Sequence, residues 1–186
     1  MSKREFKPGC MLGPVPTALV SCADDKGNTN LITLAWVGTV NTKPPMVSIS
    51  VRESRHSYEM IEKSGEFVIN LTTEEMVKMV DKCGVISGRD KDKWKMSGFT
   101  KEEARKVKAP LVKESPVNIE CRVTESKKLG THVMFLAEVV AVDVEEKYFD
   151  ENDRLDMNRM GLVAYCHGSY LSLGEVLGTF GYSVKK

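Results

Sequence analysis

The sequence predicts a single domain of the α+β class in which β-strands predominate. Short runs rich in β-branched residues recur along the chain, turn residues separate them, and the helical segments between them are short. A chain of 186 residues, 41% hydrophobic and 28% charged, can bury one substantial core, so we treat residues 1–186 as one domain. Because a barrel leaves no exposed sheet edge, we expect a closed or partly closed antiparallel barrel.

Four strands are expected in the first half of the chain. Residues 17–22 are apolar and β-branched, and a turn at residues 24–28 ends them. Two further strand-like runs lie within residues 30–38 and 40–52, and a polar turn closed by Pro44 and Pro45 joins them. Residues 67–71 are almost continuously apolar, which indicates a buried strand.

Short helices are expected between and after these strands. The first covers residues 58–63, with Ser57 as its cap and Gly65 as its stop. A capping box of Thr72 with Glu75 predicts a second helix that ends at Gly84. A short helix is expected to open at Asp90, and a second capping box predicts one more, from Thr100 with Glu103 to Val107.

The second half of the chain is more purely β. Residues 117–124 alternate apolar and polar side chains, so Asn118 and Glu120 are expected on the exposed face of a half-buried strand. A turn at residues 127–131 and a β-rich run at 132–144 complete an antiparallel hairpin. The tail from 161 to 182 is rich in Gly, Tyr and Leu, which is too apolar for a free terminus and indicates a contact with a second subunit.

Charge, the N-terminal sequence and the cysteines argue against several functional classes. With 27 Lys plus Arg against 26 Asp plus Glu, the net charge of +1 lacks the basic excess of a nucleic-acid-binding surface. No signal peptide and no stretch of about 20 apolar residues is found, so we expect a cytoplasmic protein without a membrane partner. No Cys-x-x-Cys pair predicts a metal site, and we expect mostly buried apolar thiols at Cys10, Cys22, Cys83, Cys121 and Cys166.

The segment from Asn30 to Ser57 holds the residues that most suggest a binding site. Its first run carries Asn30, Thr33 and Trp36 among aliphatic residues, and its second ends on the cationic, hydroxyl-rich patch at residues 52–57. An indole, scattered hydrogen-bonding groups and two nearby arginines suit a ligand with a flat ring at one end and a phosphate at the other. Flavin mononucleotide (FMN) fits that description.

Six segments of the sequence resemble the flavin reductase-like family with the FMN-binding split-barrel fold, and especially its flavoredoxin-like branch. The segments follow one another in the same order as in the family and extend over nearly the whole chain. They are residues 30–36, 43–52, 57–59, 65–71, 92–94 and 168–174. The resemblance implies a six-stranded antiparallel Greek-key barrel with added short helices. It also implies a homodimer that holds FMN near the subunit interface.

The resemblance further implies contacts between particular residues and the flavin. The isoalloxazine ring would lie along Asn30, Thr33 and Trp36. The phosphate or the ribityl chain would approach Arg52 and Ser57, with further candidates at Ser54, Arg55 and His56. Later flavin contacts would be Lys93, His132 and Tyr165. In the family, threonine is more frequent at the position of Ser57, and Tyr165 replaces a phenylalanine and adds a polar tip near the ring.

Physical chemistry agrees with two of these roles. Arg52, with Ser57 at the start of a helix, supplies a guanidinium and free backbone N–H groups for a phosphate. A cation such as Lys93 at the pyrimidine edge of the flavin would stabilise the anionic reduced ring and raise its potential. Structural alternatives stay open: Trp36 as a core aromatic, His132 as a structural histidine on an apolar strand, and Lys93 on a solvated charged face.

The leading functional hypothesis is an oxidoreductase that passes electrons from NAD(P)H or a protein donor through FMN to an acceptor. The sequence has no Gly-x-Gly-x-x-Gly motif after a strand, so a nicotinamide would have to stack directly over the flavin. Two alternatives stay open. One is a flavoredoxin-type electron carrier without substrate turnover of its own, and the other is a non-catalytic flavin-binding protein.

Overall fold

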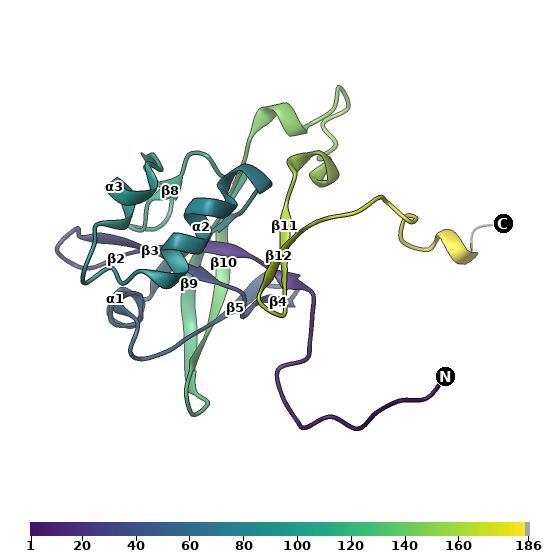
Figure 1. Cartoon of the computed structure of the whole chain (residues 1–186). Coiled ribbons are helices and arrows are strands. Elements are labelled where there is room, and N and C mark those ends of the chain that lie inside the picture. Colours follow the sequence, from purple (N-terminus) through teal and green to yellow (C-terminus); the bar gives the residue numbers. More distant parts are fainter. Residues whose placement is uncertain (185–186) are drawn as a thin grey trace.

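The computed structural model describes residues 1–184, and antiparallel strands dominate it (Figure 1). The main sheet has the strand order β3-β2-β6-β9-β10-β5-β4. In chain order these strands are β2 (Ala18–Ala23), β3 (Thr29–Leu34), β4 (Val37–Asn41), β5 (Met46–Val51), β6 (Glu66–Leu71), β9 (Val117–Lys128) and β10 (Val133–Val144). The expected mainly-β class is therefore confirmed.

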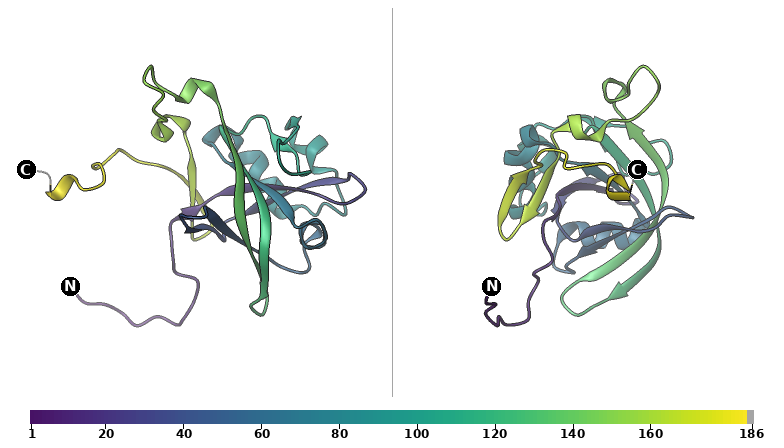
Figure 2. Two further views of the ribbon diagram at one scale, coloured as in Figure 1. Left: turned by 180° about the vertical axis from the view of Figure 1, so that it is seen from behind. Right: turned by 90° about the vertical axis from the view of Figure 1, so that its right-hand side faces the viewer.

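The main sheet curls into a barrel, as the right-hand view of Figure 2 shows. Strands β3 and β4 form its two edges, yet only Ala35 and Trp36 separate them in the chain. Because two residues span only about 7 Å, the edges must lie close together. The backbone N–H of Ser50 in β5 also donates to the carbonyl of Trp36 over 2.9 Å. The expected single strand at residues 30–38 is thus two strands with a corner between them, and the sheet has seven strands instead of six.

Two smaller sheets and several short helices complete the fold. Strand β11 (Val163–Cys166) lies between β1 (Val15–Pro16) and β12 (Ser169–Ser172), and β7 (Lys101–Glu102) pairs with β8 (Leu111–Val112). The α-helices are α1 (His56–Ser64), α2 (Val77–Val85) and α3 (Lys93–Ser97). Single 3₁₀ turns are η1 (Glu74–Met76), η2 (Glu146–Tyr148), η3 (Met157–Met160) and η4 (Tyr182–Val184).

The barrel interior forms the main hydrophobic core. Helix α1 packs its Met60 and Ile61 into this core beside Phe67 of β6 and Phe135 of β10. A second cluster lies between the outer face of the sheet and helices α2 and α3, and it includes Leu31, Val80 and Trp94. Every residue of β2 is buried, because core lies on both of its faces.

The expected helix from Thr100 to Val107 does not form, because a buried carboxylate binds the backbone that would build it. Glu120 is fully buried and accepts backbone N–H groups of Arg105, Lys106 and Val107 at 2.8, 2.6 and 3.1 Å. The expectation that Glu120 and Asn118 face solvent is also wrong, since Asn118 is buried and bonds Asn70. Tertiary contacts have therefore overridden a local capping pattern.

Two expected helix caps have other partners. Helix α1 begins with Arg55 as its N-cap, and Ser57 lies inside the first turn. The Thr72 hydroxyl donates to the backbone carbonyl of Thr17 over 2.9 Å instead of capping a helix, and η1 precedes α2.

Of the two expected helix stops, Gly84 does not end its helix, because it lies within α2, which continues to Val85. By contrast, the stop at Gly65 has the expected left-handed conformation, with φ of 67°.

The five cysteines are free thiols that differ in burial. Cys22, Cys83 and Cys121 are buried as expected, whereas Cys10 is exposed and Cys166 is half-buried. Burial raises the pKa of Cys22 to about 11 and that of Cys121 to about 12. The segment before β1 and the segment from β12 to η4 extend away from the body of the protein (Figure 1). None of the helices in residues 1–184 combines the length and the apolar character needed to cross a membrane.

Candidate functional site

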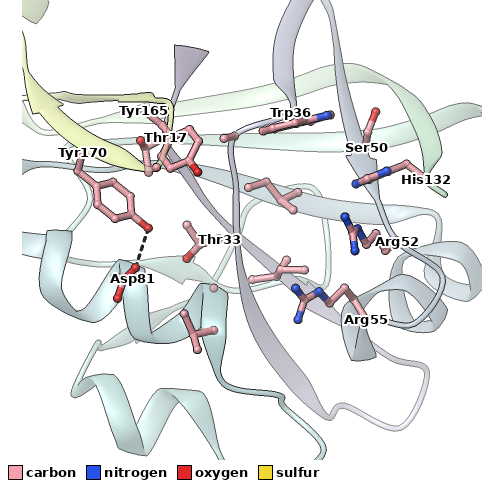
Figure 3. A pocket seen from close by; sticks show the side chains of 16 residues that line it. Thr17, Thr33, Trp36, Ser50, Arg52, Arg55, Asp81, His132, Tyr165 and Tyr170 are labelled. Atoms are coloured by element: carbon pink, nitrogen blue, oxygen red, sulfur yellow. Dashed lines mark hydrogen bonds between the residues drawn. The ribbon is translucent and has the colours of Figure 1, made fainter. Parts of the chain in front are cut away.

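The larger of two adjoining cavities, which we call the ring cavity, has a volume of about 480 Å³ (Figure 3). One wall comes from the corner between β3 and β4 together with the ends of β5 and β10. The opposite wall comes from β12, α2 and the end of β11. Trp36 forms the corner and is 46% exposed, so it is not the core aromatic of the structural alternative. A volume of this size lies within the range of small-molecule sites.

Pairing between β5 and β10 brings a cation and an imidazole together at this cavity. Val51 pairs with Val133, so Arg52 and His132 lie side by side at the ends of these strands. The His132 ring is nearly parallel to the Trp36 indole, with 6.5 Å between ring centroids and 8° between planes. Burial, and secondarily the charge of Arg52, lower the pKa of His132 below its usual 6.5. The imidazole is therefore mostly neutral at pH 7.

The opposite wall carries hydroxyl and carboxylate groups. The Tyr170 hydroxyl donates to Asp81 Oδ1 over 3.1 Å (Figure 3). The rings of Tyr165 and Tyr170 pack edge to face at 5.7 Å. Thr33 lines the cavity between the two walls, and its hydroxyl donates to the backbone carbonyl of Val80 in α2. Its proton is thus used within the protein, which leaves its oxygen as an acceptor.

The second cavity, which we call the anion pocket, adjoins the first and has a volume of about 130 Å³. The two cavities share Ile32, Arg55 and Gly84 in their walls, so they lie next to each other. The anion pocket is lined mostly by polar side chains: Asn30 of β3, Ser54, His56 and Ser57 around the start of α1, Ser87 of the loop before α3, and Lys93 of α3. The N-cap residue of α1 is Arg55, whose guanidinium cannot accept a hydrogen bond, so the first backbone N–H groups of the helix remain available to an anion.

Lys93 is a buried cation in the anion pocket, with 5% of its surface exposed. Its Nζ donates to the backbone carbonyls of Leu31 at 2.8 Å and Cys83 at 2.6 Å. An ammonium has three protons, so one remains for a ligand. Burial lowers the pKa of Lys93 below the usual 10.5. The alternative that Lys93 belongs to a solvated face is wrong.

Asn30 and Gly88 form the floor of the anion pocket. Asn30 is buried, and its Nδ2 donates to the Ser57 hydroxyl over 2.8 Å. A Cβ atom at Gly88 would lie 2.4 Å from Asn30 Oδ1, so a side chain at this position would displace the amide. Glycine is therefore required here by close packing.

Comparisons with known proteins identify the family and the fold of this chain. The model of the flavin reductase like domain matches residues 11–174. The chain belongs to this family. Flavoredoxin from Methanosarcina acetivorans has 31% sequence identity and a TM-score of 0.90, with 100% of this chain and 98% of that chain covered. Flavoredoxin of Desulfovibrio vulgaris (Miyazaki F) has 27% identity and a TM-score of 0.91, covering 99% and 100%.

A third structure shares the fold. The FMN-binding protein from Thermus thermophilus has 23% identity and a TM-score of 0.80, with 96% of this chain and 99% of that chain covered. The expected flavin reductase-like family and its split-barrel fold are therefore confirmed for this chain.

In this flavin reductase-like protein, the expected site residues divide between the two cavities. The ring cavity is lined by Thr33, Trp36, Arg52, His132 and Tyr165. The anion pocket is lined by Asn30, Ser54, Ser57 and Lys93, with His56 beside them. Arg55 lines both.

The structure groups three of these residues differently from the sequence. Asn30 and Lys93 line the smaller cavity with Ser57, whereas Arg52 lines the larger one with Trp36; which part of a flavin each contacts stays a prediction. Spacing along the chain did not reveal these placements, because Asn30 and Arg52 lie near strand ends whose direction depends on barrel closure.

Several lining residues were missed by the sequence analysis. In the ring cavity they include Thr17, Ser50, Asp81 and Tyr170, and in the anion pocket they include Ser87 and Gly88. No local pattern marks them, because the residues of the first group come from elements far apart in the chain: Thr17 follows β1, Ser50 lies in β5, Asp81 in α2 and Tyr170 in β12. Within residues 1–184, no group of three or more His, Cys, Asp or Glu side chains is arranged to hold a metal ion.

Proposed function

We propose that this protein is an FMN-dependent oxidoreductase that passes electrons from NAD(P)H or a protein donor through the flavin to an acceptor. One observation supports the proposal above all others: a cavity with an aromatic wall lies next to a small pocket that holds a buried cation, and the two share three wall residues. FMN combines a flat ring with a phosphate in one molecule. Its ring suits the larger cavity and its phosphate the smaller one.

The anion pocket fits a phosphate for three reasons. Lys93 has one free proton, because its other two bond the carbonyls of Leu31 and Cys83. Ser57 accepts a hydrogen bond from Asn30, and its own hydroxyl proton, which can also reach the Cys22 sulfur, can be donated to a ligand. The start of α1 adds backbone N–H groups. We assign the phosphate to this pocket, with Ser54 and Arg55 at its rim.

The ring cavity fits an isoalloxazine. Trp36 and His132 offer aromatic surfaces, and Thr33 and Tyr165 line the same space. Arg52 is the cation at this end, and a positive charge beside a flavin favours the anionic reduced ring. We therefore transfer to Arg52 the role in tuning the potential that the sequence suggested for Lys93. Bound FMN would supply the redox chemistry itself, and these residues would bind and orient it.

Retention of flavin and its reduction together test the proposal. The purified protein should be yellow or take up FMN, and NADH or NADPH should bleach the visible flavin band under anaerobic conditions within seconds. A colourless protein that shows no fluorescence quenching with FMN contradicts the flavin site. Bound FMN that neither nicotinamide bleaches contradicts the use of NAD(P)H.

A second candidate function is that of an electron carrier without substrate turnover of its own. The likeness to two flavoredoxins over nearly the whole chain favours it. This function and the first share the FMN site and differ in the donor. Reduction by a reduced redox protein, together with inertness towards both nicotinamides, would identify the carrier.

We also propose that the protein is a homodimer. The chain ends carry large apolar side chains that the subunit leaves exposed: Leu12 is 90%, Leu177 92% and Phe180 104% exposed. Both ends extend from the side of the molecule where β11 and β12 lie (Figure 1). Burial of such surface in a partner would be favourable. Light scattering should give twice the chain mass, and a monomer that still binds FMN would contradict this proposal.

A cytoplasmic location is part of the same proposal. All five cysteines are free thiols in the structure, including the exposed Cys10. Free thiols persist in a reducing compartment. Fractionation of cells that make the protein should recover it with cytoplasmic markers, and recovery in a membrane or secreted fraction would contradict the assignment.

A further inference from the structure

One end of the ring cavity holds polar groups that the proposed flavin contacts leave largely unused. We call this end the tyrosine corner and define it by Thr17, Asp81, Tyr165 and Tyr170. Sheet pairing builds it, because Val15 of β1 pairs with Tyr165 of β11, which in turn pairs with Tyr170 of β12. Figure 3 shows the corner across the cavity from Arg52 and His132.

Thr17 carries a buried hydroxyl that has no partner. The residue is only 3% exposed, and among residues 1–184 its Oγ1 finds no hydrogen-bonding group. Its backbone carbonyl accepts from the Thr72 hydroxyl, so the rest of the residue is firmly held. Buried hydroxyls are nearly always hydrogen-bonded. Thr17 also lines the cavity, so a molecule bound there whose acceptor oxygen reaches the hydroxyl would supply the missing partner.

The rest of the corner disfavours anions. The Tyr170 hydroxyl donates to Asp81 Oδ1, and burial together with this bond raises the pKa of Tyr170 to about 12, so the hydroxyl keeps its proton. Asp81 therefore adds the one negative charge among the residues that line the described ring cavity. The positive charges of Arg52 and Arg55 lie at the other end. A negatively charged molecule would be drawn away from the corner.

We propose that the tyrosine corner binds the second reactant of the flavin, and that this reactant is a neutral planar compound with a carbonyl oxygen, of the aryl ketone or quinone class. The carbonyl accepts the Thr17 proton, and the ring packs against Tyr165 and Tyr170. Asp81 discriminates against carboxylates. This inference rests on the proposed function, because the second reactant must meet a bound flavin.

The test uses two probes of nearly equal shape, neutral 1-acetonaphthone and anionic 1-naphthoate. Each is titrated into the FMN-loaded protein and followed by the shift of the visible flavin band. We expect the ketone to bind about tenfold tighter, or more. Thr17→Val keeps the shape of the side chain, removes the hydroxyl and should weaken the ketone about three- to tenfold. Thr39→Val, at an exposed position of β4, is the matched control and should change nothing.

Asp81→Asn tests the charge separately. The amide can still accept from Tyr170, so the corner keeps its shape. The variant should bind naphthoate about threefold tighter and the ketone as before, with the gain reduced by salt. This pattern would assign the discrimination to the carboxylate itself.

Several outcomes would overturn the inference, and they differ from failure of the flavin site. FMN affinity is measured first, for the wild type and for every variant. A wild-type protein that takes up no FMN would refute both the proposed function and this inference. If FMN binds but Thr17→Val weakens FMN itself, the hydroxyl contacts the flavin and the inference is wrong. If FMN binds and both variants bind both probes like the wild type, the second reactant binds elsewhere.

Discussion

The side-chain amide of Asn30 donates a hydrogen bond to the hydroxyl of Ser57 over 2.8 Å, although 27 residues separate the two in the chain. Both side chains are buried, at 4% and 1% exposure. Because the Ser57 oxygen accepts this bond, its own proton can be donated either to the nearby Cys22 sulfur or to a ligand. The pair therefore offers a hydroxyl donor to the anion pocket, which both residues line. In sequence, Ser57 looks like a helix cap, and only the tertiary contact shows its other use.

Removal of the Ser57 hydroxyl should weaken FMN specifically. In Ser57→Ala, a hydrogen bond to a charged phosphate is lost, which corresponds to about 1.5–3 kcal/mol, or roughly tenfold to hundredfold in affinity. Riboflavin lacks the phosphate and should bind as before. Fluorescence-quenching titrations with both flavins measure the effect. Ser64→Ala, at the far end of α1, is the control. Equal losses for the two flavins would place the phosphate elsewhere.

Lys93 should make FMN binding dependent on pH at the alkaline end. Its pKa is lowered by burial, so the ammonium loses its proton at a lower pH than an ordinary lysine. FMN affinity should fall as the pH rises through this value, while riboflavin affinity should not follow. Lys93→Met should remove the pH effect together with most of the preference for FMN. Lys95→Met, on the exposed side of the same short helix, should leave both unchanged. An alkaline loss that persists in Lys93→Met would contradict this assignment.

The two tryptophans should separate ligand binding from stability. Trp36 is 46% exposed in the ring cavity, so Trp36→Ala should weaken flavin by about 0.5–1.5 kcal/mol beyond the lost contact area. Trp94 is 5% exposed within a core cluster, so Trp94→Ala should lower the free energy of unfolding by about 3–5 kcal/mol. Urea unfolding and flavin titration of both variants measure these effects. The same loss of flavin affinity in both variants would show that the ring is misplaced.

Arg52 should affect the potential of the flavin and the pKa of His132 together. Its charge is the second cause, after burial, of the lowered pKa of His132. Arg52→Met should therefore raise that pKa part of the way to 6.5, as followed by NMR titration, because burial still acts. The potential of bound flavin should fall in the same variant, since the anionic reduced ring loses a cation. The affinities for FMN and for riboflavin should change by the same factor. A loss of affinity confined to FMN would show that Arg52 contacts the phosphate and not the ring.

The pH dependence of His132 has a definite sign. The pKa of His132 is lower in the folded state than in the unfolded state. Between these two pKa values, the unfolded state therefore binds more protons than the folded state, and acid favours unfolding. Stability should thus be fully present above about pH 6.5, the unfolded value, and should decline as the pH falls towards the folded pKa.

The sequence predicted best those parts of the fold that local patterns determine. The hairpin of β9 and β10 and the buried strand β6 follow from apolar periodicity and turn residues. The corner at Trp36 was not predicted, because a bend between two strands depends on barrel closure and leaves no local mark. Glu120 shows the same limit, since its burial depends on a loop more than ten residues away in the chain.

The candidate site was predicted as a set of residues but not as an arrangement. The hydroxyl, indole and arginine positions between 30 and 57 do line the two cavities. Their division between a ring end and an anion end depends on which strand ends face which helix. The buried state of Lys93 could not be read from its charged neighbours, because Asp92 caps α3 and turns the lysine inward towards two backbone carbonyls.

The central claim is that one FMN spans both cavities, with its phosphate in the anion pocket. The most direct measurement is a fluorescence-quenching titration of the flavin-free protein with FMN and, separately, with riboflavin. The account predicts about one FMN per chain and an affinity at least tenfold higher for FMN than for riboflavin, as a charge-assisted hydrogen bond to the phosphate requires. Absence of FMN binding, or equal affinities for the two flavins, would contradict it.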